Sequence, residues 1–513
     1  MKTEKPIKKF STKNGVVRVR MAPSPTGSLH IGTARTALFN YLFAKKKRGV
    51  FVLRIEDTDP ERSDSKFEKD ITESLKWLGI LWDEGVEIGG NYAPYRQSER
   101  ATIYAKYTEQ LLKEEKAYHC FCKEDELAAQ RQDQIARGVA PKYSGKCRSL
   151  SKDKIKKNLA EGQPSIIRFK TPVGEKISFD DLIRGRIVFY SDILDDFAIA
   201  KNPDLPLYNF AVVIDDFEMK ITHVIRGEDH ISNTPKQILL QRALGFPQPQ
   251  YAHLPLILGK DRSKMSKRHG PVSIFQYKDA GYLPEAIVNF IALLGWNPGT
   301  EKEIFSLEEL TEEFDIKKVQ KSAAIFNIEK LNWMNGYYIR QKSVGELTKL
   351  CLPFLEKENL IKKQNTRYQI QDTNEPVDIN WLEKIIALEQ PRLKTLGEIG
   401  KRIGFFFVKE LKYPAGLLKW KDMTAVEISA SLDRLFKILS DIDKGSFTER
   451  NLKDVLMKEA ELIGDRGKLF WPLRVALCGM RDSAGPFEIA EILGKEKCLE
   501  RIKNAMDILN LEF

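Results

Sequence analysis

Three consecutive segments near the start of the chain decide its fold: VVRVRM (16–21), APSPTG (22–27) and SLHIG (28–32). The first is rich in β-branched residues and predicts a strand, which the prolines and the glycine of the second segment end. The third opens a helical pattern that closes with basic residues before Gly49. Because the apolar run 50–55 then predicts another strand, the sequence indicates a βαβ unit with a right-handed crossover.

The βαβ unit also predicts where a ligand binds. Ligands of open parallel sheets lie outside the carboxyl ends of the strands, and a helix N-terminus at that edge favours a phosphate group. Gly27 and Gly32 allow a ligand to approach the backbone closely. The segment contains no G-x-G-x-x-G pattern, so it does not predict a dinucleotide site.

Two motifs that lie far apart resemble the signatures of class I aminoacyl-tRNA synthetases. APSPTGSLHIG (22–32) resembles the His-Ile-Gly-His signature in the form that ends in a small residue. SKMSKR (263–268) resembles the Lys-Met-Ser-Lys-Ser loop. The segments RMAPSPTG (20–27) and RIEDTD (54–59) are similar to bacterial glutamyl-tRNA synthetases, and the resemblance runs from about residue 16 to the C-terminus.

The resemblance implies that L-glutamate is activated by ATP, with Mg²⁺, and transferred to the 3′ end of tRNA(Glu). Such a reaction needs donors that neutralise charge on phosphate oxygens rather than a nucleophilic side chain. The implied catalytic residues are His30, Lys264 and Lys267. The implied ATP site comprises Pro23, Thr26, Gly27, His30, Gly32, Lys264, Met265, Ser266, Lys267 and Arg268. A packed histidine at a helix start and a solvated basic loop are the alternative interpretations of the two motifs.

A planar guanidinium is the best ligand for the side chain of a glutamate substrate. Arg20 and Arg226 each end a predicted strand, so we expect both at the ligand edge of the sheet. The resemblance assigns both to glutamate recognition and pairs Glu56 with the substrate amine. The implied glutamate site comprises Arg20, Ala22, Ser24, Glu56, Tyr208, Arg226 and His230. A structural ion pair is the alternative role for either arginine.

One cysteine cluster is a candidate zinc site. Cys120, Cys122 and Cys147 supply three thiolates, whereas structural zinc takes four ligands. Tyr143 lies four residues before Cys147, and a resemblance to a zinc protein that modifies tRNA implies that it is the fourth ligand. His119 or water are the alternative fourth ligands, and three reduced cysteines without a metal are the alternative to a zinc site.

The expected fold class is α/β: a Rossmann-type parallel-sheet catalytic domain, split by an α+β insertion and followed by all-α C-terminal domains. The apolar run 207–216 is expected to begin the second part of the sheet, and the polar stretch 362–376 to be a loop or linker. The expected bounds are 1–14 for a disordered basic extension, 15–98 and 206–282 for the catalytic domain, 99–205 for the insertion, which grips the tRNA acceptor end in the family, 283–365 for a helical domain that contacts the tRNA stem, and 366–513 for a helical anticodon-binding domain.

The helical C-terminal part resembles bacterial glutamyl enzymes, since glutaminyl and eukaryotic-type relatives carry β-barrels there. QPRLKTL (390–396) resembles the segment whose arginine reads the third anticodon base, and WPLRVALCG (471–479) resembles a segment that helps to read the first. The implied anticodon residues are Arg392, Arg474, Ser483 and Phe487. We therefore expect tRNA(Glu) as the partner; an enzyme that also charges tRNA(Gln), or a glutaminyl-tRNA synthetase, is the alternative.

The composition argues against a membrane protein and against a secreted protein held by disulfides. The 513 residues carry a formal net charge of +11, which favours a polyanionic partner such as RNA. No apolar run reaches the ~20 residues of a membrane span, so no membrane partner is expected. Six cysteines in so long a chain indicate a reducing compartment, and we expect a cytoplasmic monomer. A catalytically silent RNA-binding paralogue is the rival from another functional class.

Overall fold

The computed structural model of the chain describes residues 15–59, 61–263, 265, 271, 273–365 and 367–512. The chain divides into two compact units, Met1–Tyr277 with Pro284–Ile328, and Lys278–Leu283 with Glu329–Phe513. The predicted disordered extension, 1–14, lies outside the described residues. The same holds for four predicted site residues, Lys264, Ser266, Lys267 and Arg268.

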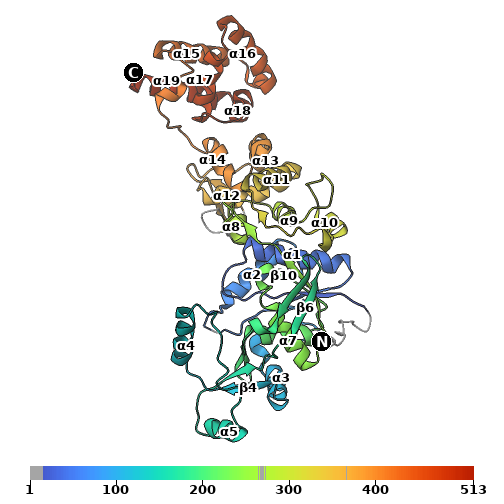
Figure 1. The fold of residues 1–513 in the computed structure, drawn as a ribbon. Helices are drawn as coiled ribbons and strands as arrows, with labels where there is room; N and C mark the ends of the chain where they lie inside the picture. Colours follow the sequence, from blue (N-terminus) through green and yellow to red (C-terminus); the bar gives the residue numbers. More distant parts are fainter. Residues whose placement is uncertain are drawn as a thin grey trace. The chain divides into compact units, whose positions relative to one another are not determined.

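The predicted βαβ unit opens the first unit (Figure 1). Strand β1 (Arg18–Met21) is buried along its length and pairs in parallel with β2 (Val50–Leu53), and helix α1 (Ile31–Lys46) connects the two. A Cβ on Gly49 would lie 2.3 Å from the carbonyl oxygen of Val17, so glycine is what lets the chain enter β2 this close to β1. The prediction for this segment is confirmed.

The parallel sheet extends to both sides of β1. On one side β2 pairs with β3 (Glu84–Gly85), and on the other Thr222 N donates to Arg18 O over 2.9 Å, which places β10 (His223–Gly227) beside β1. Strand β10 pairs in parallel with β11 (Gln250–Leu254), and helix α7 (Thr234–Leu244) connects them. The carboxyl ends of these strands form the edge at which we expected a ligand.

The run 207–216 is not a strand. It forms most of helix α6 (Tyr208–Glu218), so the expectation that it begins the second part of the sheet is wrong. A continuous apolar run fits a buried helix as well as a buried strand, and periodicity does not separate the two. The helix presents Asp215 and Asp216 to the interior, where both carboxylates are buried.

The α+β insertion is confirmed. Its antiparallel sheet has the order β4-β5-β8-β9, formed by β4 (Ala117–Cys120), β5 (Ile166–Phe169), β8 (Ala198–Asn202) and β9 (Leu205–Pro206). Three helices accompany it: α3 (Ala101–Lys113), α4 (Glu124–Ala136) and α5 (Lys152–Ala160). Two further strands, β6 (Lys176–Asp181) and β7 (Gly185–Tyr190), leave that sheet and extend the catalytic one, because β6 pairs in parallel with β11. The insertion is therefore tied into the catalytic sheet itself.

The remaining elements of the first unit are α2 (Ser65–Trp77), β12 (Ile257–Leu258), α8 (Ile274–Asp279, of which the last two residues belong to the second unit), α9 (Pro284–Ala292), α10 (Leu307–Glu313) and β13 (Ala324–Ile325). Residues 283–365, predicted as one helical domain, contribute to both units. Among the described residues, no helix combines the length and the apolar character that a membrane crossing requires.

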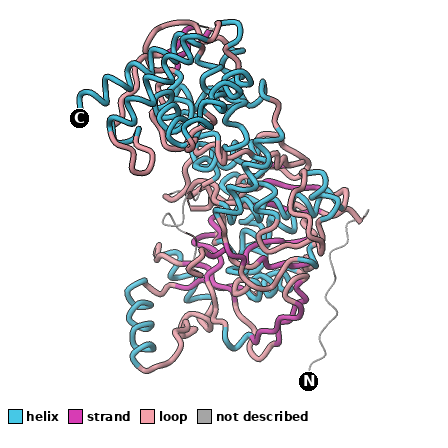
Figure 2. Tube along the Cα trace, turned by 90° about the horizontal axis from the view of Figure 1, so that it is seen from above, coloured by secondary structure: helices cyan, strands magenta, loops and turns pink. Residues whose placement is uncertain are grey.

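The second unit is built almost entirely from helices, which Figure 2 shows in cyan along the chain toward the C-terminus. Its helices are α11 (Ile328–Gln341), α12 (Val344–Lys357), α13 (Ile379–Glu389), α14 (Ile399–Ile403), α15 (Ala425–Asp441), α16 (Glu449–Ile463), α17 (Gly467–Cys478), α18 (Pro486–Leu493) and α19 (Lys495–Glu512). The expectation of a loop at 362–376 is wrong in part, since β14 (Ile361–Gln364) and β15 (Arg367–Ile370) form an antiparallel hairpin there.

Candidate active site

A cavity of about 1080 Å³ opens at the carboxyl ends of β1, β2, β10 and β11. Its size suits a nucleotide together with a small metabolite, since sites for single small ligands usually measure ~300–1,000 Å³. The predicted residues that line it are Arg20, Ala22, Pro23, Ser24, Thr26, Gly27, His30, Gly32, Glu56, Tyr208, Arg226, His230 and Met265. Every predicted ATP or glutamate residue that the structure describes therefore faces one cavity.

Residues next to the two signature motifs meet at this cavity. Met265, which belongs to the second motif, lines the cavity together with His30 from the first. Beyond the second motif, Ser273 forms a β-bridge with His30, and Ile274 N donates to Leu29 O over 2.8 Å. The chain thus returns to the start of α1 after the second motif, although more than 230 residues separate the two in sequence.

His30 caps helix α1. Its Nδ1 accepts from Thr33 N over 3.3 Å, and its Nε2 lies 2.8 Å from the Thr33 hydroxyl. A Cβ on Gly32 would lie 3.3 Å from the imidazole ring, so glycine leaves this ring room at the helix start. The exposed imidazole therefore stands beside the first free amides of α1, where the helix dipole favours an anion.

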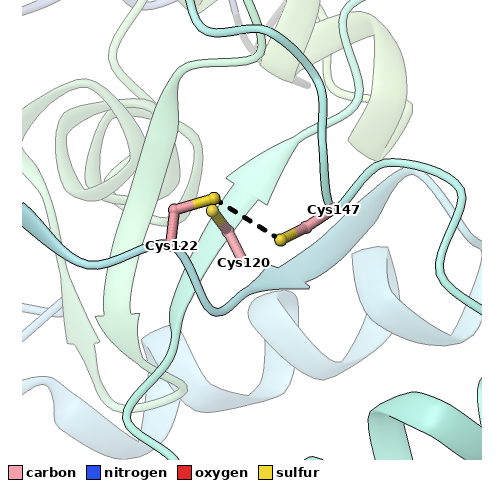
Figure 3. A group of neighbouring side chains, drawn as sticks. All are labelled: Cys120, Cys122 and Cys147. Atoms are coloured by element: carbon pink, nitrogen blue, oxygen red, sulfur yellow. Dashed lines mark hydrogen bonds between the residues drawn. The ribbon is translucent and has the colours of Figure 1, made fainter. Parts of the chain in front are cut away.

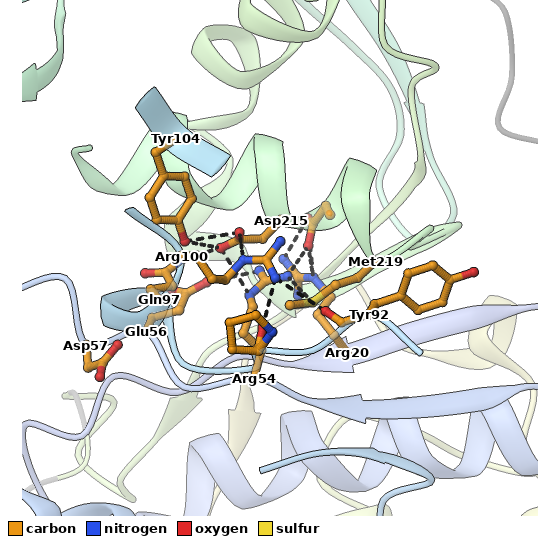
Figure 4. A network of polar contacts seen from close by, with 12 residues as sticks. Arg20, Arg54, Glu56, Asp57, Tyr92, Gln97, Arg100, Tyr104, Asp215 and Met219 are labelled. Atoms are coloured by element: carbon orange, nitrogen blue, oxygen red, sulfur yellow. Dashed lines mark hydrogen bonds and ion pairs between the residues drawn. The ribbon is translucent and has the colours of Figure 1, made fainter. Parts of the chain in front are cut away.

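A buried charge cluster supports the opposite side of the cavity, and Figure 4 shows its arginines around Asp215. Arg54 is fully buried at the end of β2 and contacts three carboxylates. Its distances are 2.8 Å to Asp216, 3.1 Å to Glu56 and 3.7 Å to Asp215. Arg20 also pairs with Asp216, over 3.2 Å. Arg54 and Asp216, which do not line the cavity, thus hold the two cavity residues Arg20 and Glu56 in place.

Asp215 links this cluster to the start of the insertion. Arg100 Nε donates to Asp215 Oδ1 over 2.7 Å, and Gln97 Nε2 donates to Oδ2 over 2.7 Å. The hydroxyl of Tyr104 on α3 donates to the same carboxylate over 3.0 Å. Because an unpaired buried carboxylate is costly, these donors fix α6 against the segment that enters the insertion.

The cluster sets the two carboxylates apart in acidity. Burial raises the pKa of Glu56, and the charges of Arg54 and Arg20 offset that rise only in part. Burial also opposes ionisation of Asp216, but Arg20 and Arg54 outweigh it and lower the pKa of this carboxyl below its ordinary value. Asp216 therefore stays ionised and anchors the arginines, whereas Glu56 in the cavity is closer to protonation.

A third part of the cavity wall is formed by β10 and η3 (Glu228–His230). Arg226 is buried; its Nη2 donates to Thr234 Oγ1 over 2.8 Å, while its Nη1 has no hydrogen-bond partner among the described residues. Tyr208 Oη lies 3.0 Å from His230 Nδ1. Burial and the nearby Arg226 lower the pKa of His230 to about 4, so this imidazole is neutral at physiological pH.

The cysteine cluster lies in the insertion (Figure 3), and none of its residues lines the cavity. The sulfur atoms of Cys120, Cys122 and Cys147 lie within 4.8 Å of one another. Tyr143 joins them, with its hydroxyl 3.3 Å from Cys120 Sγ and 3.6 Å from Cys122 Sγ. His119, by contrast, lies 3.1 Å from Ser165 Oγ and is not a member of the group. The four predicted ligand residues therefore lie close together in the insertion.

The predicted anticodon residues all lie in the second unit. Arg392 forms ion pairs with Glu389 and with Asp482, the neighbour of Ser483, so the segment 390–396 lies beside the predicted residue Ser483. Ser483 is buried, and its hydroxyl donates to Ala484 O over 2.9 Å. Phe487 packs edge-on against Phe470, and Arg474 lies half-buried on α17. A smaller cavity of about 290 Å³ beside Arg392 is lined by Glu329, Asn332, Trp333, Gly336, Arg340, Pro391, Arg392, Leu393 and Lys394.

Sequence reasoning missed the residues that support the cavity from behind. Arg54 interrupts the apolar run of β2, and Asp215 and Asp216 end the apolar run of α6. Charges inside buried runs require partners, so this pattern could have identified the cluster. Ser273 and Gln276 also line the cavity, but no local pattern distinguishes them from surface residues.

The comparisons with known proteins cover almost the whole chain. Residues 16–333 match the family model described as tRNA synthetases class I (E and Q), catalytic domain, and residues 346–506 match an anticodon binding domain. Glutamate–tRNA ligase of Carboxydothermus hydrogenoformans is 48% identical over 492 residues, which cover 95% of this chain and 99% of the relative. Glutamate–tRNA ligase 1 of Caldicellulosiruptor saccharolyticus is 48% identical over 495 residues, covering 95% of this chain and 98% of the relative.

A solved structure supports the same conclusion. It is a glutamate tRNA ligase from Elizabethkingia meningosepticum in complex with its amino acid, and it is 38% identical to this chain. The match has a TM-score of 0.83 and covers 96% of this chain and 99% of the solved one. The chain belongs to the class I aminoacyl-tRNA synthetases, in the glutamate–tRNA ligase family.

Proposed function

We propose that the chain activates glutamate with ATP and transfers it to the 3′ end of tRNA(Glu) in cytoplasmic protein synthesis. The observation that carries this proposal is the cavity that gathers the described residues predicted to bind ATP and glutamate, among them His30 of the first motif and Met265 of the second. Full-length relatives named glutamate–tRNA ligase support the same activity.

In this proposal the cavity has a phosphate end and an amino-acid end. At the phosphate end, His30 and the first amides of α1 donate to the phosphates of ATP, with Lys264 and Lys267 of the second motif as further donors. Mg²⁺ bound with ATP would neutralise phosphate charge. At the amino-acid end, Arg226 Nη1 takes the side-chain carboxylate and Glu56 takes the amine.

The reaction then needs positioning rather than a protein nucleophile. The α-carboxylate of glutamate attacks the α-phosphate of ATP, and pyrophosphate leaves. The terminal hydroxyl of the tRNA attacks the carbonyl of the resulting mixed anhydride and releases AMP. The role of the cavity is to hold carboxylate and phosphate in line while its cationic groups neutralise the charge that develops.

Recognition of tRNA is assigned to the basic chain as a whole and to the second unit in particular. The cavity at Arg392 places Arg340, Lys394 and the half-exposed indole of Trp333 together. Cationic groups beside an aromatic face suit an unstacked base, because the base can stack while its phosphate is neutralised. This arrangement supports a contact between the second unit and unstacked bases of the tRNA, as an anticodon loop offers.

We expect the purified chain to charge tRNA(Glu) with labelled glutamate and to charge tRNA(Gln) much more slowly, with no charging by glutamine. Arg392 is the reason to expect the preference for tRNA(Glu), and the helical C-terminal part and Arg226 are the reasons to expect no charging by glutamine. Aminoacylation of the two purified tRNAs measures it directly. Equal rates with both tRNAs would identify an enzyme that does not discriminate, and absence of any adenylate would favour a silent RNA-binding protein.

Lys267→Ala tests whether the charging measured in that assay comes from this chain rather than from a contaminating ligase. Loss of one donor to the reacting phosphates typically lowers kcat by about 10²–10³-fold, whereas the KM for glutamate should change little. Lys260→Ala, a nearby lysine outside the motif, should retain the activity of the parent chain. A contaminating ligase in the preparation would make both variants equally active.

We also propose a structural zinc ion in the insertion. Three sulfur atoms lie within 4.8 Å of one another, and the Tyr143 hydroxyl lies 3.3 and 3.6 Å from two of them, so four donor atoms, the number that structural zinc takes, gather in one place. Zinc there would fix β4 to the loop that carries Tyr143 and Cys147 and would stabilise the insertion. No step of the reaction passes through it.

Metal analysis is expected to give about one zinc per chain in protein purified without chelators. Cys147→Ser should reduce the zinc content to near zero and lower the melting temperature of the insertion, because one of four ligands is lost. Cys351→Ser is the matched control, since Cys351 is a buried free cysteine outside the cluster. Parent protein with far less than one zinc per chain would contradict the proposal.

A further inference from the structure

Arg226 is the end of a buried hydrogen-bonded chain that crosses three neighbouring strands. Arg226 on β10 lies directly opposite His253 on β11 in the parallel register. Arg226 Nε donates to His253 Nε2 over 3.2 Å, and His253 Nδ1 lies 2.6 Å from Asp181 Oδ2 on β6. The side chains of His253 and Asp181 are completely buried, and neither residue lines the cavity.

The contacts fix the protonation state of His253. An arginine has only donors, so His253 Nε2 must carry a lone pair toward Arg226. The hydrogen of the neutral ring therefore sits on Nδ1 and is donated to Asp181. Asp181 is suited to accept it, because Ile183 N and Arg184 N also donate to its Oδ1 over 2.9 and 2.8 Å. Arg226 therefore donates to His253, and His253 donates to Asp181.

We propose that Asp181 and His253 are positioning residues that fix the guanidinium of Arg226 for the side-chain carboxylate of glutamate. The inference rests on the proposed function, in which Arg226 binds that carboxylate. With Nε held by His253 and Nη2 by Thr234, the plane of the guanidinium is set, and Nη1 is left for the substrate. A guanidinium group held in one orientation loses less conformational entropy when it binds a carboxylate than a freely rotating guanidinium does.

The origin of Asp181 gives this arrangement a further consequence. Asp181 ends β6, which belongs to the stretch 99–205 that the sequence predicts as the insertion, whereas His253 and Arg226 lie on strands of the catalytic sheet. The amino-acid end of the cavity is therefore completed by a residue of the insertion. A change in the insertion that moves β6 would reach Arg226 through two hydrogen bonds and without contact to any substrate.

Three variants of the full-length chain test the proposal in ATP–pyrophosphate exchange with tRNA present. His253→Leu removes the acceptor for Arg226 at similar volume, and we expect the KM for glutamate to rise about 10-fold or more while the KM for ATP stays within about twofold. His253→Gln returns an acceptor near the Nε2 position and should recover most of the loss. Tyr251→Phe on the same strand removes a comparable buried hydrogen bond, to Gln241, and should leave both KM values unchanged.

The outcomes separate this inference from the proposed function. If Arg226→Lys raises the KM for glutamate but His253→Leu does not, the positioning role is wrong and the function stands. If Arg226→Lys itself has no effect, the assignment of Arg226 is wrong, and the positioning role falls with it. An equal rise of the glutamate and ATP KM values in His253→Leu would indicate general damage and would also overturn the proposal. Should that variant not fold, Asp181→Asn takes its place under the same criteria.

Discussion

Replacement of Arg226 by leucine is expected to lower kcat/KM for glutamate about 30-fold or more. The reason is that truncating one member of a buried charge pair costs about 2–5 kcal/mol. Arg226 Nη1 is buried at the cavity wall without a hydrogen-bond partner in the part of the chain that the structure describes, so the substrate carboxylate is the group that would satisfy it. Arg226→Lys should fall between parent and leucine variant, because it keeps the charge but loses the planar fork. The measurement is ATP–pyrophosphate exchange at varied glutamate.

The choice between glutamate and glutamine gives a second test of the role of Arg226. Glutamine differs from glutamate in carrying no side-chain charge, so the preference for glutamate over glutamine should shrink in Arg226→Leu along with kcat/KM. Arg242→Leu serves as the control, because Arg242 pairs with Glu175 and does not line the cavity. An unchanged ratio of glutamate to glutamine activation in Arg226→Leu would remove Arg226 from substrate recognition.

The βαβ unit and the edge of the sheet at which a ligand binds could be predicted from the sequence because both depend on local patterns. Strand VVRVRM (16–21) and the glycine-containing turn after it determine the βαβ unit, and the carboxyl ends of its strands determine the ligand edge. Arg20 and Glu56 therefore came out at the cavity from their positions alone. The other lining residues, such as Tyr208 and His230, and the second motif needed the family resemblance, since no local pattern assigns them a ligand.

The supporting residues could not be placed in the same way. Asp181, His253 and Arg226 lie on three strands that are adjacent only because β6 leaves the sheet of the insertion and joins the catalytic sheet. No local period encodes that pairing. The prediction for the run 207–216 was wrong for a different reason. A continuous apolar run suits a helix that is buried on all faces and a central strand equally well, so only the tertiary structure decides between them.

Arg54→Met is expected to destabilise the first unit by about 3–5 kcal/mol, the usual cost of removing one partner from a buried ion pair. Arg54 is fully buried and faces three carboxylates, so methionine leaves Glu56 without its closest cation and weakens the hold on Asp215 and Asp216. Thermal unfolding of the full-length chain should show the transition of this unit lowered by about 6 °C or more. Arg18→Met, which removes one ion pair with the less buried Glu84, should have a smaller effect.

The same variant should also change how activity depends on pH. The pKa of Glu56 is already raised by burial, and Arg54 is the larger of the two charges that hold it down, ahead of Arg20. Without Arg54 that pKa rises further, so a larger fraction of Glu56 is protonated and unable to bind the substrate amine at a given pH. The acid limb of the profile of kcat/KM for glutamate should therefore move to higher pH in Arg54→Met and stay in place in Arg18→Met. A lower melting temperature with an unmoved acid limb would mean that Arg54 supports the fold alone and that another group controls the ionisation of Glu56.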